Sequence, residues 1–328
     1  MKLLTTLCFI SGIFFSVFSH GLSCPNKVID YKKFPGVKSE KDISRNQDSV
    51  GWCQSFVAAD MLCYHFNKKA NWTLKDQCSA ADLKVNFEPD QDWLKNKEKS
   101  GSLSSLTIFG RYTNQGVCAE SAFPSEFWNN QADGTNKVYE ALSRLYEREK
   151  TEGRPSVDGL CPECAAISPN VTSKQIVEHV SKSNTGKEYI ASLNKIACQG
   201  RRLGQGIEVK VNQDSISKLL KPVEKKDLLI AQIEKENPVY VSIEASSLVE
   251  NAKGGHAVLA IGAQEMEIGN GRKDCFVILK NSWGRDCGVI KKHELGARSL
   301  SCDPNTGLLY LSMGYFLSKL NSLEWIEE

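Results

Sequence analysis

The chain has 328 residues, of which 41% are hydrophobic and 24% are charged, and its formal net charge is +2 at pH 7. That length suits one large domain or two modest ones, and the composition is ordinary for a globular protein with a sizeable core. A charge so close to neutral gives no reason to expect a nucleic-acid partner, and the sequence has no block of like charges that would form an electrostatic tail.

The N-terminus predicts export. An apolar run without charges covers residues 3–18, which is short for a membrane span and typical of the core of a secretory signal peptide. Small residues follow it, so we predict a signal peptide over residues 1–23 and a secreted, periplasmic or endolysosomal protein. An uncleaved anchor is one alternative. A lipoprotein anchored at Cys24 is another, but Gly21 stands where a larger aliphatic residue is usual. We expect no stable membrane insertion.

The first part of the mature chain predicts helices. Residues 24–46 look extended and polar. Residues 54–66 then have the spacing of a helix, with Phe56, Ala59 and Cys63 along one stripe.

A second helix is predicted over residues 102–114, after which the chain changes character. Residues 126–204 combine an amphipathic stretch at 137–150, on which Val138 and Leu142 share a face, with turns rich in glycine and proline. This region forms a variable middle between a helical half and a β half.

From about residue 205 the β signal dominates. Four short segments alternate or run apolar, at residues 239–245, 257–263, 275–280 and 307–313. Between the second and the third, Asn270-Gly271 is a strong hairpin signal. The predicted fold class is therefore α+β. An N-terminal segment and helical lobe cover residues 24–125, the variable middle follows, and a β lobe covers residues 205–328.

The cysteine count is odd. Twelve cysteines less Cys8, which lies in the predicted signal, leave eleven, so in an oxidising compartment one thiol is left over. The full connectivity does not follow from the sequence. Cys287 and Cys302 bracket one polar segment and form the best single pair. Cys161-x2-Cys164 suggests zinc or redox chemistry, but no second such pair accompanies it, so disulfides are favoured and no metal is expected.

Cys53 is the candidate for the leftover thiol. It stands at the start of the predicted helix 54–66, where the partial positive charge of a helix N-terminus favours the thiolate that a cysteine nucleophile must become. Taken alone, a disulfide or a buried small side chain is the commoner role for a cysteine in an exported chain. A nucleophile also needs an imidazole to take its proton.

His256 is the candidate imidazole because it opens an apolar strand, where its side chain can project into a cleft. Asn281 ends the next strand and can orient the imidazole if the hairpin brings the two together. A two-residue turn would pair Asn281 with Ala260, which leaves His256 roughly 13 Å away. A six-residue loop at 266–271 would place Asn281 directly opposite His256. Both registers stay open, and alone His256 would more often be a structural histidine.

An acyl transfer also needs donors for the developing oxyanion. The backbone N–H of Cys53 at the helix start is one, and the side-chain amide of Gln47, six residues upstream, can supply the second. Ordinary loop polarity is the alternative for Gln47 taken alone. The order Gln, Cys, His, Asn is specific although each residue is a weak signal.

These residues resemble the papain family of cysteine peptidases. The matching pieces are Gln47 with Cys53, the strand start Gly255-His256-Ala257-Val258 and, most specifically, ILKNSWG at residues 278–284. GVCAESAFP at 116–124 and NPVYVSI at 237–243 are further agreements. The resemblance covers roughly residues 30–125 and 225–320, about six-tenths of the chain.

The resemblance implies a two-lobed fold, with a helical lobe bearing Cys53, an antiparallel β-barrel-like lobe bearing His256, and the substrate between them. It implies Cys53 as nucleophile, His256 as its acid–base partner, Asn281 as the group that orients the imidazole, and Gln47 as oxyanion donor. The expected reaction is hydrolysis of peptide bonds in a peptide or protein substrate through a covalent acyl-enzyme, without a cofactor.

Two residues beside Asn281 have supporting roles in the resemblance. Trp283 would shield the contact between His256 and Asn281 from water, and Ser282 would support the site.

The chain also departs from the family. Val50 stands where the family has a disulfide cysteine, and Trp52-Cys53-Gln54 replaces the usual Ser-Cys-Trp, so the walls around the thiol differ. The substrate-binding residues are less clear: Gly101-Ser102 lies near the place of the family's Gly-Gly, and Gly255 is a further candidate. We expect no long inhibitory propeptide. The insertion at 126–204 is expected to cover the cleft or to contact a regulator.

Two other function classes stay open. One is a catalytically inactive papain-like binding protein, against which the intact set of Gln47, Cys53, His256 and Asn281 argues. The other is a different thiol acyl transferase, such as a transglutaminase-like or arylamine acetyltransferase enzyme. These enzymes share the order Cys, His, acid but commonly use Asp as the third member, so Asn281 favours a peptidase.

Overall fold

The computed structural model describes residues 23–87, 113–126, 134–151, 185–213, 221–290 and 300–327, together with isolated positions between 167 and 183. The apolar run of the predicted signal, Gly101-Ser102 and Cys161-x2-Cys164 lie outside the described residues, as does most of the helix predicted over 102–114. For these segments the predictions stand untested.

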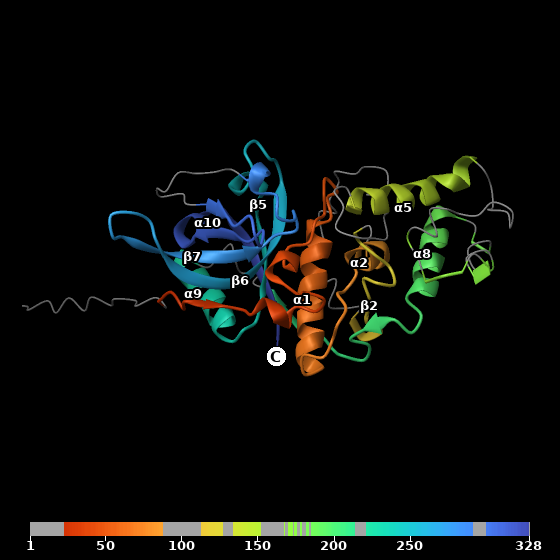
Figure 1. The fold of residues 1–328 in the computed structure, drawn as a ribbon, viewed down its shortest axis with the longest axis horizontal. Coiled ribbons are helices and arrows are strands. Elements are labelled where there is room, and N and C mark those ends of the chain that lie inside the picture. Colours follow the sequence, from red (N-terminus) through yellow and green to blue (C-terminus); the bar gives the residue numbers. More distant parts are fainter. Residues whose placement is uncertain are drawn as a thin grey trace, which may run out of the picture.

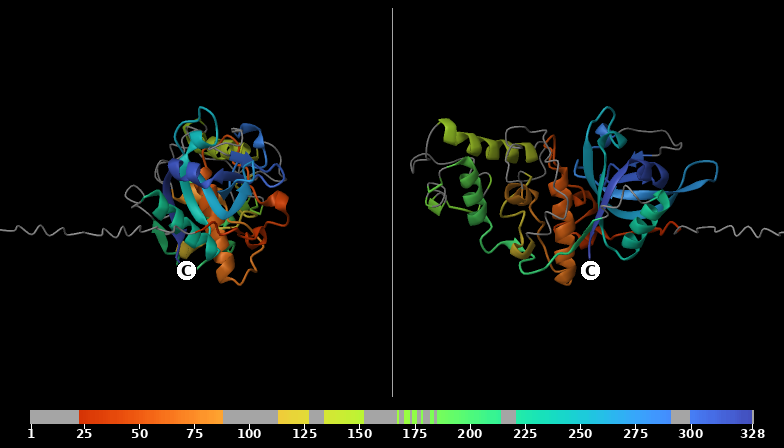
Figure 2. Two further views of the ribbon diagram at one scale, coloured as in Figure 1. Left: turned by 90° about the vertical axis from the view of Figure 1, so that its left-hand side faces the viewer. Right: turned by 180° about the vertical axis from the view of Figure 1, so that it is seen from behind.

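The described elements form a sheet lobe and a helical lobe, and helix α1 of the helical lobe lies next to the sheet lobe (Figure 1). Seen from behind, the same order runs along the long axis of the molecule (Figure 2). The helical lobe consists of four helices and one small pair of strands: α1 Cys53–Lys69, α2 Ala80–Phe87, α5 Gly134–Thr151, α8 Gly186–Ala197, β2 Val117–Cys118 and β3 Arg202–Leu203. Short 3-10 helices occur at Tyr31–Lys33, Glu40–Asp42, Thr113–Gln115, Ala245–Ser247 and Cys287–Val289.

The sheet lobe is built on eight antiparallel strands in the order β4-β10-β5-β6-β7-β9-β8, with β1 paired to β6 beside this path. The strands are β1 Lys27–Val28, β4 Val211–Gln213, β5 Val239–Glu244, β6 Gly255–Glu267, β7 Lys273–Lys280, β8 Leu300–Cys302, β9 Leu309–Ser312 and β10 Leu320–Ile326. Helices α9 Pro222–Glu234 and α10 Met313–Lys319 complete this lobe.

The α+β class is confirmed. The four predicted strand segments correspond to β5, β6, β7 and β9, and the predicted helix 54–66 corresponds to α1. The β half also contains α9 and α10, which its apolar pattern did not reveal. Helix α9 does carry a start signal, because Pro222 is its first residue and the Glu224 side chain accepts a hydrogen bond of 2.6 Å from the Lys221 N–H.

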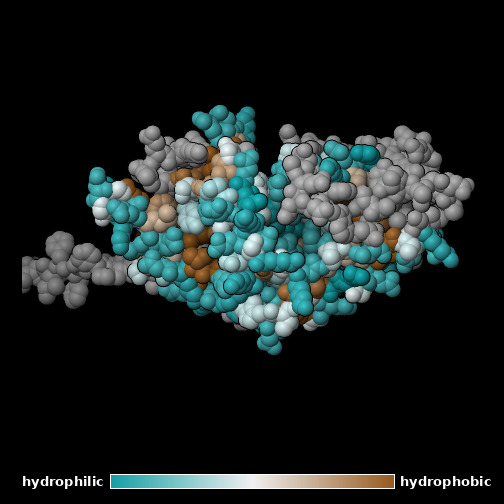
Figure 3. All heavy atoms as spheres, in the orientation of Figure 1, coloured by the Kyte–Doolittle hydropathy of each residue, from teal (hydrophilic) through white to brown (hydrophobic). Residues whose placement is uncertain are grey.

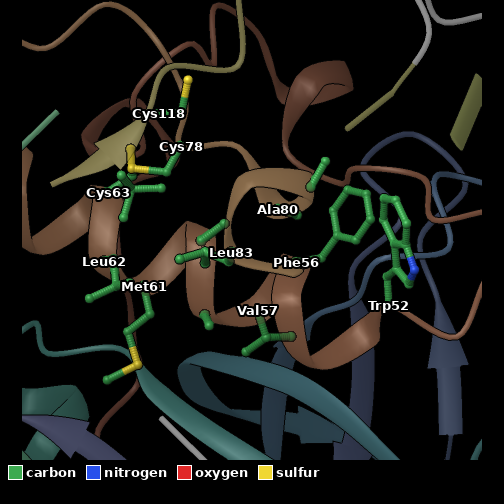
Figure 4. Packing of buried hydrophobic residues seen from close by; sticks show 14 of the residues in the cluster. Trp52, Phe56, Val57, Met61, Leu62, Cys63, Cys78, Ala80, Leu83 and Cys118 are labelled. Carbon is green, nitrogen blue, oxygen red and sulfur yellow. A yellow bond between two sulfur atoms is a disulfide. The ribbon is translucent and has the colours of Figure 1, made fainter. Parts of the chain in front are cut away.

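Helix α1 is buried more completely than its predicted stripe suggests. Phe56, Ala59 and Cys63 are buried, as predicted, but so are 13 of the 17 residues of the helix. Figure 4 shows Leu83 of α2 facing α1, and it also shows the disulfide that joins Cys63 of α1 to Cys78. A helix covered by another helix on one side and by a sheet on another has no broad polar face, which explains why one stripe underestimates its burial.

Strand β6 separates two hydrophobic cores. Its residues Ala257, Leu259 and Ile261 belong to the core around α1, whereas Val258 and Ala260 belong to the core under α9 and α10. This division follows the period of two of a β-strand. A strand that is buried on both faces reads as a continuous apolar run, as residues 257–263 do.

The β6–β7 hairpin adopts neither predicted register. A bulge before Gly262 shifts the pairing by one residue partway along the strands, and beyond it Leu259 pairs with Lys280. The next residue, Asn281, therefore lies opposite Val258, two residues from His256. This register lies between the two predicted ones, which placed Asn281 opposite His256 or opposite Ala260.

Strand β1 lies against the bulge. A Cβ atom at Gly262 would lie 2.8 Å from the carbonyl oxygen of Lys27 and 2.9 Å from Cα of Val28. The Ile29 N–H donates to the carbonyl of Ile261 at 2.8 Å. Only glycine lets the N-terminal segment approach β6 this closely.

Four disulfides occur among the described residues. They are Cys24–Cys275, Cys63–Cys78, Cys118–Cys198 and Cys287–Cys302. The predicted pair Cys287–Cys302 is confirmed. Because the sulfur of Cys24 is bonded to Cys275, the alternative of a lipid anchor at Cys24 is wrong for this structure.

The face of the molecule in Figure 3 is mostly hydrophilic. Among the described residues, the large hydrophobic side chains that are exposed are Val28, Trp72 and Val223. No helix in the described part of the chain has the length and apolarity that a membrane crossing needs.

Candidate active site

Cys53 is the first residue of α1 and the one free cysteine among the described residues. Its side chain is buried, with 4% of the residue exposed. At this position the backbone N–H has no acceptor within the helix, and the helix dipole places partial positive charge near the sulfur. The structure thus places the predicted thiol where the sequence expected it.

His256 and Asn281 meet despite the unexpected register. His256 Nε2 lies 2.8 Å from Asn281 Oδ1, and the Ser282 N–H donates to the same oxygen at 2.9 Å. Since Ser282 N–H can only donate, this contact identifies the oxygen of the Asn281 amide. The bond to His256 therefore requires a proton on Nε2, which leaves Nδ1 of the neutral imidazole as an acceptor.

Trp283 covers the pair. Its ring stacks on the His256 ring with centroids 4.3 Å apart and an interplanar angle of 28°. Both His256 and Asn281 are buried, at 6% and 3% exposure. A hydrogen bond shielded from water in this way is electrostatically stronger than the same bond in solvent.

His256 lowers the pKa of the Cys53 thiol. Burial alone would raise this pKa. It is outweighed by four effects together: the charge of His256, the hydrogen bond from His256 to the sulfur, and the hydrogen bonds from the backbone N–H groups of Ala257 and Gln54. The arrangement therefore favours the thiolate form of Cys53.

Gln47 is buried next to Asn281. Its Nε2 donates to the Val50 carbonyl at 2.7 Å, and its Oε1 accepts a hydrogen bond from Ser282 Oγ. The Gln47 backbone N–H donates to the Ser282 carbonyl at 2.7 Å. These contacts join Ser282 to Gln47, and the supporting role that the resemblance implied for Ser282 stays a prediction.

The pairing between the two loops continues on both sides of Gln47. Asn46 and Trp283 form an antiparallel bridge, and the Gly284 N–H donates to the Arg45 carbonyl at 2.8 Å. The loop before α1 is thereby attached by its backbone to the segment that follows β7. This attachment brings residues more than two hundred positions apart in the sequence into one site.

Two buried cations, Arg45 and Lys280, pair with partly buried carboxylates next to this pairing, and our predictions from the sequence did not include this group. Arg45 contacts Glu120 at 2.7 Å, Asp60 at 3.7 Å and Glu126 at 3.9 Å, and Lys280 forms an ion pair with Asp60. Lys280 alone could have indicated such a group from the sequence, because a lysine at the end of an apolar strand is either exposed or paired with an acidic residue.

Burial raises the pKa of Glu126 to about 7. Arg45 opposes this shift, and the neighbouring carboxylate of Glu120 adds to it. The Glu126 carboxyl accepts a hydrogen bond from the Asn46 backbone N–H, so it also holds the loop that carries Gln47.

The departures from the papain pattern have different consequences. Val50 and Trp52 are each only 1% exposed, and their side chains pack in the hydrophobic core around α1. Gly255 is exposed at the start of β6. Nothing in the structure tests its predicted contact with substrate.

One group among the described residues has the distances of a metal site, namely Asp82, Cys118 and Cys198. The two sulfurs form a disulfide, and the Asp82 carboxylate accepts from the Asn194 side chain at 2.8 Å and from the Cys118 N–H at 2.8 Å. These partners account for Asp82 as a structural residue.

Comparison with models of protein families gives no match, and comparison with curated proteins gives none either. Among solved structures, SERA5E from Plasmodium falciparum is 12% identical and matches over 93% of this chain and 96% of that chain, with a TM-score of 0.45. Digestive procathepsin L 3 from the larval midgut of Tenebrio molitor is 14% identical over 92% of this chain and 76% of that chain, with a TM-score of 0.39. Both TM-scores lie below 0.5, so neither similarity supports a function for this chain.

Proposed function

We propose that the chain is a papain-like cysteine peptidase that acts through Cys53, His256 and Asn281. The observation that carries the proposal is the bond of 2.8 Å between His256 Nε2 and Asn281 Oδ1, beside a free thiol whose pKa His256 lowers. An orienting amide, an imidazole and an activated thiol in contact are what nucleophilic acyl transfer requires.

In the proposed reaction the Cys53 thiolate attacks the carbonyl carbon of a peptide bond. The carbonyl oxygen becomes an oxyanion, which accepts hydrogen bonds from the Cys53 N–H and from Gln47 Nε2. Gln47 Nε2 has two N–H groups. One donates a hydrogen bond to the Val50 carbonyl, which leaves the other for the oxyanion. Collapse of the intermediate breaks the C–N bond, and His256 Nδ1–H gives its proton to the leaving amine.

Hydrolysis of the acyl-enzyme reverses these roles. Neutral His256 accepts a proton from water at Nδ1 while the water oxygen attacks the thioester carbon. The S–C bond then breaks, the carboxylic acid leaves and the thiolate–imidazolium pair is restored. Throughout, Asn281 holds Nε2 protonated, so the proton exchange takes place on Nδ1.

The disulfides support the further proposal that the protein is exported. Four pairs occur among the described residues, and such density is typical of oxidising compartments. A cysteine peptidase with one free thiol among paired cysteines needs that thiol to stay accessible to substrate and protected from disulfide formation. The burial of Cys53 at 4% exposure meets the second need.

The test is digestion of a diverse peptide library by the wild type and by Cys53→Ala, with products sequenced by mass spectrometry in ¹⁸O water. We expect the wild type to cleave, with ¹⁸O entering the new carboxyl group, and Cys53→Ala not to cleave. Equal cleavage by both proteins would exclude the proposal. Acyl groups joined to amines without ¹⁸O would point to a transferase.

A second arm separates an inactive protein from a misfolded one. An epoxysuccinyl peptide should label Cys53 in the wild type and should fail to label His256→Ala at the same pH. Absence of labelling of Cys53 in wild type that is correctly folded by circular dichroism would assign the chain to the inactive binding proteins.

A further inference from the structure

The insertion is anchored directly beside Gln47. Helix α5 begins at Gly134, and the backbone N–H groups of Thr135 and Asn136 donate to Asp48 Oδ2 at 2.7 and 3.1 Å. Asp48 follows Gln47 in the chain, so the residue next to the oxyanion donor caps a helix that begins more than eighty residues later. A carboxylate at this position is stabilised by the free N–H groups and by the helix dipole.

Two more hydrogen bonds join the same surfaces. Thr135 Oγ1 donates to the Asn46 carbonyl at 2.6 Å, and Ser49 Oγ lies 3.0 Å from Asn136 Oδ1. Thr135 is completely buried in this contact. The loop formed by residues 46–49 is therefore bonded to α5 before and after Gln47.

The same loop is held from its other side by Ser282, which bonds to both the backbone and the side chain of Gln47. Asp48 has a φ of 51°, a left-handed conformation that few residues other than glycine adopt. Its N–H donates to Asn46 Oδ1 at 2.9 Å. A loop in this conformation keeps its shape only while its contacts are made.

The start of α5 also borders the site itself. Asp48 and Asn136 line a groove together with Trp283, Val249 and Asp286. Helix α5 in turn packs on α8, which is joined to the helical lobe by the disulfide Cys118–Cys198. The insertion is thus attached to the lobe at both of its ends.

We propose that Asp48 is a positioning residue, which caps α5 and thereby fixes Gln47 as the oxyanion donor. The insertion then supports the site, which differs from the cover or regulator contact that the sequence suggested. This inference rests on the proposed peptidase function. It adds the prediction that loss of Asp48 impairs only the step in which the oxyanion forms.

The kinetic test uses Asp48→Ala with the peptide that the library digest ranks first. Removing one oxyanion donor lowers kcat by about 100- to 1,000-fold in other acyl-transfer enzymes, so a misplaced donor should cost about 10- to 100-fold in kcat with little change in KM. Asp48→Asn keeps an acceptor for the α5 N–H groups and should restore most of the rate. Glu140→Ala, which removes an exposed carboxylate of α5 that pairs with Arg144, is the matched control and should keep kcat.

A double variant separates positioning from general damage. In a Gln47→Ala background, Asp48→Ala should add less than about 3-fold, because the group it positions is already gone. The rate of alkylation of Cys53 by iodoacetamide should stay within about 2-fold of wild type, since that reaction forms no oxyanion. Additive losses in the double variant, or slower alkylation, would overturn the inference.

Hydrogen exchange gives a readout that does not depend on activity. Asp48→Ala should speed amide exchange in peptides covering residues 46–50 and 134–138, and Glu140→Ala should not. Unchanged exchange in Asp48→Ala would overturn the positioning role even if the chain proved to be a peptidase. Absence of cleavage by the wild type, with faster exchange in Asp48→Ala, would reject the peptidase proposal and keep the structural link.

Discussion

Glu126 should make the protein lose stability between mild acid and mild alkali. Its pKa in the fold is about 7, above its ordinary value of 4.5. The unfolded chain therefore releases this proton as the pH passes 4.5, whereas the folded chain keeps it until about 7. The stability that comes from the neutral form is complete below the lower value and is lost as the pH rises through the higher one.

The size of the effect follows from that difference. A carboxyl group whose pKa rises by about 2.5 loses about 3.4 kcal/mol of stability when it is fully ionised, of which about 2.5 kcal/mol falls between pH 5 and pH 8. The Glu126 side chain is 27% exposed, and solvent weakens the penalty. We therefore expect a loss of about 1–2 kcal/mol over that range.

The assay is urea denaturation at intervals from pH 5 to pH 8 in a Cys53→Ala background, which prevents self-digestion. Glu126→Gln keeps an acceptor for the Asn46 N–H but cannot ionise. It should match its parent at pH 5 and exceed it by about 1–2 kcal/mol at pH 8. Glu244→Gln removes an exposed carboxylate paired with Lys319 and should leave the pH dependence of its parent unchanged. Parallel pH curves for Glu126→Gln and its parent would refute the buried neutral carboxyl.

Three further changes test the site and the fold. His256→Ala should move the pH profile of Cys53 alkylation upward, to a pKa of about 8.5 or above, and an unchanged profile would contradict the thiolate–imidazolium pair. Replacing both Cys63 and Cys78 by alanine opens a loop with a sequence separation of 15. This should lower the free energy of unfolding in guanidinium by about 3 kcal/mol, and a loss below about 1 kcal/mol would count against it. Gly262→Ala should displace β1 and cost about 1–3 kcal/mol in a thermal melt, whereas an unchanged Tm would contradict the close approach of β1.

The sequence predicts the local part of the fold well because local patterns are set by local chemistry. The segments that became β5, β6, β7 and β9 carry the apolar runs of buried strands, and the helix after Cys53 carries its own spacing. The apolar pattern gave no sign of β10, although Leu323 and Ile326 on it are buried. Its partners β4 and β5 lie earlier in the chain, and only that pairing makes it a strand.

Neither the register of His256 and Asn281 nor the buried charges could be derived in the same way. The register depends on the bulge between Ala260 and Gly262, where β1, which lies more than two hundred residues earlier in the chain, pairs with β6. Lys280 and Asp60 are likewise 220 residues apart, so the sequence around either residue does not identify its partner. Long-range contacts of this kind decide which charged residues can be buried.

The site depends on contact between the two lobes for its chemistry as well as its shape. Cys53 lies on the helical side, and burial there alone would raise its pKa and keep it a thiol. His256 and the Ala257 N–H, both on β6, reverse that shift. Because the groups that lower the pKa of Cys53 come from both lobes, we expect a change that separates the lobes to raise this pKa. The pairing of Gln47 with Ser282 and the ion pair of Lys280 with Asp60 cross this same junction, so these contacts help to hold together the two lobes whose groups surround Cys53.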